Sequence, residues 1–230
     1  MARKPADTTA KPADPRKTVV EALMALAASR PYDSISLADI CIEANIPLVD
    51  LRDLFPSKGA ILGGFLRMTD REVLTGTGTD MTGETTHDRV LDVMMRRFDS
   101  LGPYREGLRS VRDGLRRDPI SALAFNQAAL NSWRYMLEAA GVTTEGALGA
   151  LKLQGAVLVF ARAFDVWLDD DADMARTMAA LDRELQRGER VLGQAEALHR
   201  FTAPFRGFAR AACNRRASKK RDETSEASAG

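Results

Sequence analysis

The side chains that most often carry catalysis or hold a metal are few and scattered in this chain of 230 residues. The two histidines, His87 and His199, have no cysteine or acidic cluster beside them at the spacing of metal ligands. Cys41 and Cys213 are far apart and form no C-x-x-C motif, so neither a disulfide framework nor a structural zinc site is predicted. No glycine-rich phosphate loop is present. We therefore expect a protein that is not an enzyme, needs no metal or cofactor and resides in the cytoplasm.

Charge is the other chemistry that the sequence offers, and it is unevenly distributed. The chain has 33 Lys and Arg against 32 Asp and Glu, a formal charge of +1. Residues 1–17 hold five bases and two acids, residues 165–173 hold five acids and no base, and residues 199–221 hold eight bases and no acid. The two basic segments suit a polyanion such as DNA or an anionic membrane. The near-neutral total therefore excludes neither partner.

The elements that must position these residues are helices. Apolar residues recur at spacings of three and four, and no stretch alternates with period two, so the fold class is all-α. The predicted helices cover residues 16–29, 36–44, 47–54, 58–74, 84–101, 104–117, 119–140, 145–169 and 172–198, with a short one near 203–213. The basic arm 1–15 and the polar tail 214–230 are expected to be disordered. The longest apolar stretch is too short to cross a membrane.

Two short helices joined by a tight turn are predicted within residues 33–58. Ser36 and Asp39 have the spacing of a capping box, which starts a helix. Asn45 tolerates the left-handed conformation that ends a helix, and Pro47 suits the first turn of the next one. Such a pair is either a helix-turn-helix, whose second helix can enter the major groove of DNA, or a plain helical hairpin in an all-α core.

The run from Arg16 to Leu62 resembles the DNA-binding domain of the TetR family of transcription regulators. The resemblance rests on Ile-Ser-Leu-Ala-Asp-Ile at 35–40, Asn-Ile-Pro at 45–47, and Phe-Pro-Ser-Lys at 55–58 with Ile-Leu at 61–62. It implies a homodimer of helical subunits. Each subunit would have a three-helix helix-turn-helix domain over residues 16–74 and a larger ligand-binding and dimerisation domain over residues 84–198. Family members commonly repress transcription until a small molecule binds.

The predicted recognition helix departs from the family pattern where it would meet DNA. The family usually has tyrosine where Arg52 stands, and residues 33–58 hold five acids against two bases, which should repel phosphates. Phosphate contacts would then come from Arg52, Lys58 and the bases at the start of the first helix. The residues assigned to the double-stranded DNA interface are Arg16, Lys17, Ser36, Leu48, Val49, Asp50, Arg52, Asp53 and Lys58.

The later helices predict a surface for a second subunit. Apolar residues of helix 172–198 follow a heptad pattern, and helix 145–169 is apolar on more than one face. We expect the two helices of each subunit to form a four-helix interface, although an intramolecular core would explain the same residues. The dimer residues assigned are Leu151, Leu158, Met174, Met178, Leu181, Leu185 and Leu192.

Aromatic and methionine side chains of the same region predict a pocket for a small apolar ligand or lipid, because they offer large, adaptable apolar surfaces. Plain core packing is the alternative. The arginine-rich stretch from Arg96 to Arg117 favours a solvated helix face. The pocket residues assigned are Met94, Phe98, Phe125, Trp133, Met136 and Phe160.

A second class of function stays open at the C-terminal end. Within the basic segment 199–213, Phe201, Phe205 and Phe208 have the spacing of an interfacial amphipathic helix. Residues 133–190 are also similar to the lipid-binding ubiquinone-biosynthesis proteins, which share the TetR fold and have a degenerate DNA-binding unit. The alternative function is a lipid-binding accessory protein of ubiquinone biosynthesis, with peripheral membrane contact through residues 201–213.

Overall fold

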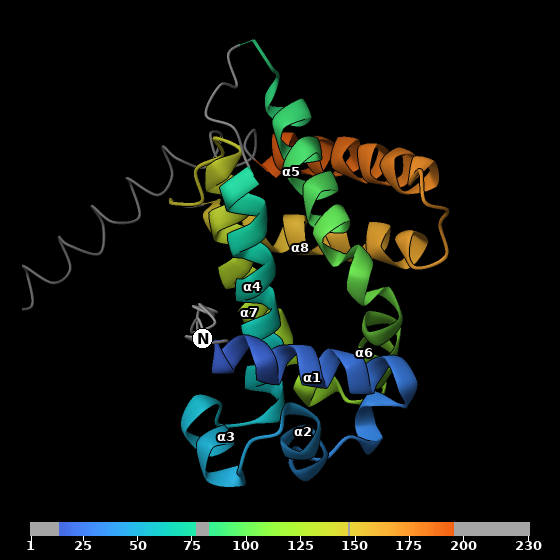
Figure 1. Cartoon of the computed structure of the whole chain (residues 1–230). Helices are drawn as coiled ribbons and strands as arrows, with labels where there is room; N and C mark the ends of the chain where they lie inside the picture. The colour runs from blue at the N-terminus through green and yellow to red at the C-terminus, as the bar shows by residue number, and fades with distance from the viewer. Residues whose placement is uncertain (1–13, 77–82, 147, 196–230) are drawn as a thin grey trace, which may run out of the picture. The chain divides into compact units, whose positions relative to one another are not determined.

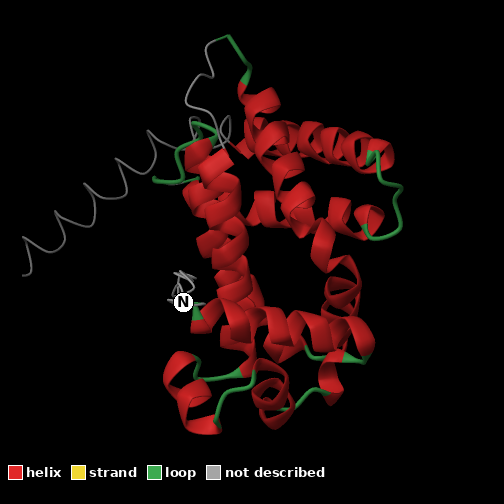
Figure 2. Ribbon diagram, in the orientation of Figure 1, coloured by secondary structure: helices red, strands yellow, loops and turns green. Residues whose placement is uncertain are grey.

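The computed structural model describes residues 14–76, 83–146 and 148–195, and these contain helices and no strand (Figure 2). Eight α-helices have the bounds α1 Pro15–Ser29, α2 Leu37–Ala44, α3 Leu48–Leu54, α4 Lys58–Gly76, α5 Thr86–Leu101, α6 Arg105–Arg117, α7 Pro119–Ala139 and α8 Gly149–Trp167. Short 3-10 helices η1 and η2 cover Tyr32–Ser34 and Gly102–Tyr104. Residues 175–185 are helical as well. The all-α prediction is confirmed.

The chain divides into two compact units, and the boundary lies between residues 185 and 186. The second unit is described over residues 186–195, which are helical and include Leu192. The arm 1–13, the helix expected near 203–213 and the tail 214–230 lie outside the described residues. The helix-turn-helix and the larger helical part both lie in the first unit.

The local signals in residues 36–47 form the turn that they predict. Ser36 Oγ accepts a hydrogen bond from Asp39 N, and the Asp39 carboxylate accepts one from Ser36 N, so the capping box is present. Asn45 ends α2 in the left-handed region at φ 52°. Leu51 is buried, and both short helices pack against α1 (Figure 1). This arrangement is a helix-turn-helix.

The larger part of the unit is built around α4, which packs along α7 and against α5, while α8 packs on α7 and α5. α6 packs against α1 and η1, and two of its glycines lie at the points of closest approach. A Cβ on Gly107 would lie 2.6 Å from Met24 O, and one on Gly114 would lie 2.5 Å from Asp33 Oδ1. At Gly107 the obstructing atom belongs to the backbone, so only glycine permits so close an approach there.

The predicted helix 172–198 starts later than expected. Met174 has a left-handed φ of 52° and lies before the helix, whose first N–H groups are held by Asp173 and Asp170. Leu181 and Leu185 are buried within the unit, whereas Met178 is half exposed. The predicted heptad face is therefore divided between the core and the surface. The buried side of this helix is formed by residues 177, 180, 181 and 184, and Met178 lies outside it.

Candidate nucleic-acid interface and internal cavity

The outward face of α3 carries the side chains that the sequence predicted there. Leu48, Val49, Asp50, Arg52 and Asp53 are all exposed. Pro47 precedes the helix, and the buried Leu51 anchors its inner side. The exposed face of α3 therefore carries two apolar side chains, one base and two acids, while the opposite face packs against the domain through Leu51.

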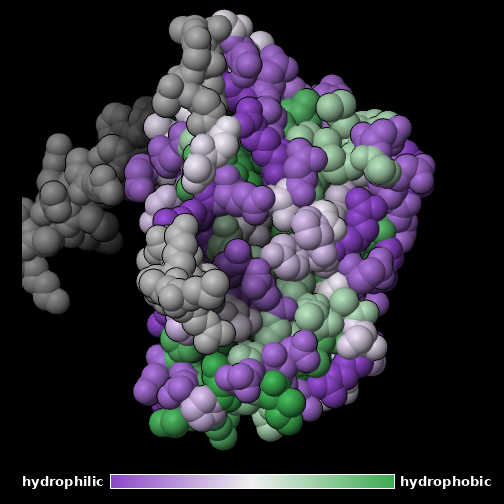
Figure 3. Space-filling view, in the orientation of Figure 1, coloured by the Kyte–Doolittle hydropathy of each residue, from purple (hydrophilic) through white to green (hydrophobic). Residues whose placement is uncertain are grey.

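Exposed apolar side chains add to this surface. Ile42 of α2 is 79% exposed, and Leu48 and Val49 of α3 are 57% and 66% exposed. Figure 3 shows hydrophobic residues gathered at the end of the molecule formed by α2 and α3. Such side chains can contact the methyl group of thymine in a major groove.

The bases assigned to the interface differ in whether their charged groups already have a partner within the chain. Arg16 is exposed and its guanidinium lies over the Phe55 ring at 5.1 Å, while Lys17 is exposed and pairs with Glu21 at 3.5 Å. Arg52 makes no hydrogen bond or ion pair within the described part of the chain. It is therefore the base of α3 best placed to meet a phosphate or a base edge.

Lys58 serves the fold directly. Its ammonium donates to Tyr32 O at 2.8 Å and to Ile35 O at 2.9 Å, and lies 4.2 Å from the centre of the Tyr32 ring. Burial lowers the pKa of Lys58, with Asp33 opposing the shift. The first residue of α4 thus fastens the loop that leads into α2.

Ser36 likewise has a structural partner. Its hydroxyl and its backbone N–H, together with Arg30 at 3.2 Å, lower the pKa of Asp39 to about 2. The Ser36 side chain is exposed, yet its oxygen is occupied by the cap of α2.

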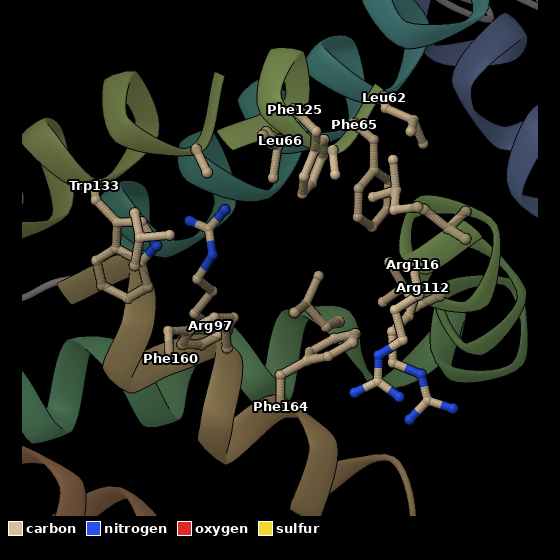
Figure 4. A pocket seen from close by; sticks show the side chains of 18 of the residues that line it. Leu62, Phe65, Leu66, Arg97, Arg112, Arg116, Phe125, Trp133, Phe160 and Phe164 are labelled. Atoms are coloured by element: carbon tan, nitrogen blue, oxygen red, sulfur yellow. The ribbon is translucent and has the colours of Figure 1, made fainter. Parts of the chain in front are cut away.

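An apolar cavity of about 510 Å³ lies within the same unit, between α4, α5, α6, α7 and α8 (Figure 4). This volume is in the usual range for small-molecule pockets. The side chains that line it are Leu62, Phe65, Leu66, Arg97, Leu101, Leu108, Val111, Arg112, Leu115, Arg116, Pro119, Ala122, Phe125, Ala129, Trp133, Val157, Phe160, Ala161 and Phe164.

Half of the predicted pocket residues lie on this wall. Phe125, Trp133 and Phe160 line the cavity, while Met94, Phe98 and Met136 are fully buried in the core and are not among the lining residues. Phe98 stacks on Phe160 with ring centres 4.4 Å apart, so it supports the wall from behind. Apolar periodicity does not distinguish a wall from the layer behind it, since both are buried.

Arg97 is the lining residue that the sequence placed incorrectly. The arginine-rich stretch favours a solvated face, but Arg97 is 2% exposed. Its Nη1 donates to Asp70 Oδ1 at 2.6 Å, and Ser132 Oγ donates to the same oxygen at 2.6 Å. The buried charge is tolerated because Asp70 pairs with it. That acid comes from α4, 27 positions away, and no local pattern reveals it.

Four other arginines of this stretch, all on α6, contact the acidic turn 165–173, whereas Arg96 pairs with Asp92 and Arg117 with Asp33. Arg116 binds Asp165 at 2.8 Å, and Arg109 binds Asp169 at 2.6 Å, which lowers the pKa of Asp169. Arg105 donates to Asp170 O at 2.7 Å. The ion pairs join α6 to the end of α8, so the two opposite charge runs neutralise each other across the fold.

Three residues assigned to the dimer interface are exposed in the first unit. Leu151 and Leu158 of α8 are 41% and 49% exposed, and Met178 is 50% exposed. Leu151 and Leu158 are seven residues apart and share one side of the helix. An added Cβ on Gly155, between them, would meet no atom within 4 Å.

Metal and membrane sites have no support in the described ranges. No group of three His, Cys, Asp or Glu residues there could hold a metal ion, and Cys41 is a buried free thiol. His87 Nε2 lies 2.8 Å from Asp182 Oδ1. None of the helices described is long and apolar enough to span a membrane.

Two solved structures resemble this fold along most of their length. A TetR transcriptional regulator from Nitrosomonas europaea superposes with a TM-score of 0.58 at 20% identity, covering 76% of this chain and 99% of its own. A TetR transcriptional regulator from Rhodococcus sp. RHA1 gives 0.50 at 19% identity, covering 76% and 95%. No protein-family model and no curated protein sequence matches the chain. The chain therefore has the TetR fold, and the ubiquinone-biosynthesis alternative is not favoured.

Proposed function

We propose that this protein is a TetR-like transcription regulator that binds double-stranded operator DNA as a homodimer, represses transcription and is released by a small apolar ligand. The observation that carries the proposal is the helix-turn-helix, in which a buried Leu51 fixes α3 while its polar and apolar face stays exposed. Such a regulator would act in the cytoplasm.

The route from ligand to DNA in this proposal is α4. Leu62, Phe65 and Leu66 of α4 line the cavity, and Lys58 at the start of the same helix holds the loop before α2. A ligand that shifts α4 would move the loop that positions the helix-turn-helix. A ligand that binds more tightly when α4 is shifted than when it is not would favour the shifted position. It would thereby change the affinity of the protein for DNA.

The acidic face of α3 restricts how DNA could be bound. Asp50 and Asp53 cannot supply affinity for phosphates, although an aspartate can accept a hydrogen bond from cytosine N4. Arg52, Arg16 and Lys17 would supply the phosphate contacts. Binding should therefore be weak on nonspecific DNA, and its salt dependence should come from these three bases of each subunit.

The experiment is a salt titration of a DNA mobility shift with a duplex from the region upstream of the protein's own gene and a scrambled duplex of equal length. Arg52→Ala should weaken binding and, if Arg52 of each subunit meets a phosphate, reduce the slope of log affinity against log salt by about two, one for each subunit. Arg134→Ala is the matched control, because Arg134 is an exposed arginine of α7 that pairs with the exposed Glu145.

Two outcomes would contradict the proposal. One is equal binding of the two duplexes that Arg52→Ala leaves unchanged. The other is no binding to either duplex together with retention on vesicles of phosphatidylcholine and phosphatidylserine, which would support the lipid-binding alternative. Lys58→Ala is unsuitable as the test variant, since losing its two carbonyl contacts would disturb the fold as well.

A further inference from the structure

The cavity wall is apolar apart from three arginines, which differ in their surroundings. Arg112 and Arg116 are partnered by Asp113 and Asp165, and the side chain of Arg116 is 59% exposed. The side chain of Arg97 is 3% exposed. Figure 4 shows Arg97 beside Trp133 at the cavity wall, and the other two guanidinium groups at the opposite side, pointing away. Arg97 is thus the cation of the cavity wall whose side chain is almost entirely buried.

The guanidinium of Arg97 is held in place but not saturated. Asp70 accepts from Nη1, and Ser132 fixes that carboxylate from α7. Trp133 and Phe160 lie 5.4 Å and 5.8 Å from the guanidinium carbon, so the cation also packs against aromatic rings. Nε and Nη2 have no hydrogen-bond acceptor among the described residues.

The unused nitrogens have a definite chemical preference. Nε and Nη2 form one edge of the guanidinium, with two parallel N–H groups, and this fork matches the two oxygens of a carboxylate. A single hydroxyl would occupy only part of it. An apolar ligand that displaces water from the cavity and supplies no acceptor would leave these donors unpaired, which is costly, so a ligand that supplies two acceptor oxygens gains more.

From these contacts we infer that the cavity binds an apolar carboxylic acid, with the carboxylate on Arg97 and the apolar body among Phe65, Phe125 and Phe164. The inference rests on the ligand-binding part of the proposed function and names the ligand class. Asp70 and Ser132 act as positioning residues, since they orient the guanidinium and do not line the cavity.

Isothermal titration calorimetry without DNA tests this directly, using dodecanoate and dodecanol below their aggregation limits, with naphthylacetate and naphthylethanol as a second matched pair. The wild-type protein should bind at least one acid about tenfold more tightly than its alcohol, the difference expected for a charged hydrogen-bond pair. Because no DNA is present, a failure here leaves the DNA-binding proposal untouched, and a failure of DNA binding leaves this measurement valid.

Variants assign the preference to one arginine. The double variant Asp70→Asn with Arg97→Gln removes both buried charges together, which spares the fold the penalty of one unpaired charge. It should bind acid and alcohol alike. Arg116→Gln at the opposite side of the cavity, where the guanidinium is exposed and paired with Asp165, should keep the preference. If the double variant does not fold, Arg97→Lys, which retains the charge but not the fork, should reduce the preference.

Three results would overturn the inference. The first is that the wild-type protein does not prefer the acid in either pair. The second is that the preference persists in the folded double variant or, where that variant does not fold, in Arg97→Lys. The third is that Arg116→Gln abolishes the preference, which would place the carboxylate at the cavity rim.

Discussion

Asp170 shows how one buried acid organises the turn between α8 and the helix that follows. Its Oδ2 accepts from Thr177 N and Oγ1 at 2.7 Å and 2.6 Å, and its Oδ1 accepts from Arg176 Nε at 2.8 Å. Burial would raise the pKa of Asp170, but the hydrogen bonds from Thr177 and Arg176 outweigh it and hold the pKa well below its usual range. The contacts of the native structure therefore stabilise this carboxylate in its ionised form.

Asp170→Asn should lower the free energy of unfolding at neutral pH by about 2 kcal/mol, because a charged acceptor of several hydrogen bonds is lost. The folded-state pKa is depressed, so this contribution is fully present above about pH 4, the usual aspartate pKa, and is lost as the pH falls further. Urea denaturation near neutral pH and again in acid measures both effects.

The neighbouring Asp171 is the control for this variant, since its side chain is exposed and makes no hydrogen bond among the described residues. Asp171→Asn should leave the urea midpoint unchanged at either pH. Equal effects of the two substitutions would show that the charge of the turn as a whole, and not the carboxylate of Asp170, matters.

At the scale of helices, α6 connects the cavity to α1. It lines the cavity with Leu108 and Val111 and packs on α1 through Gly107. Gly107→Ala would place a Cβ 2.6 Å from Met24 O, a backbone atom that cannot rotate away. We expect a loss of about 1–3 kcal/mol in the free energy of unfolding, more than the gain in helix propensity returns.

Gly102→Ala provides the comparison, because an added Cβ there meets nothing within 4 Å and its backbone has helical angles. Urea denaturation of the two variants should separate them clearly. If Gly107→Ala is as stable as the wild type, α6 and α1 are not held at the distance seen here.

The elements were far more predictable than the site, for a physical reason. Capping boxes at Ser36 and Thr85, the left-handed Asn45 and the helix-starting Pro119 are local signals, and the helices begin and end close to them. Arg97 pairs with an acid on another helix, and Met94 and Phe160 share the same periodicity although only Phe160 reaches the cavity. Such distinctions depend on contacts between helices that are far apart in the sequence, and local sequence patterns do not reveal these contacts.

At the scale of the whole molecule, the predicted dimer surface is exposed among the described residues on one side of α8 and at Met178. Leu151 and Leu158 of α8 are partly exposed, whereas Leu181 and Leu185 are buried in the core of the subunit. Isolated apolar side chains at a surface are ordinary. Two of them on one helix side, with the open Gly155 between, permit a second helix to approach closely.

We expect the protein to sediment as a dimer at micromolar concentration and Leu158→Gln to weaken the dimer about tenfold or more, because an apolar contact at a helix interface is replaced by a polar group without a partner. The substitution should hardly change the fold, since half of this side chain is already in water. Leu123→Gln on α7 is the matched control: Leu123 is 72% exposed and lies outside the predicted interface. A wild-type protein that remains a monomer would require DNA to be bound by single copies. Equal weakening of the dimer by the two variants would move the interface away from α8.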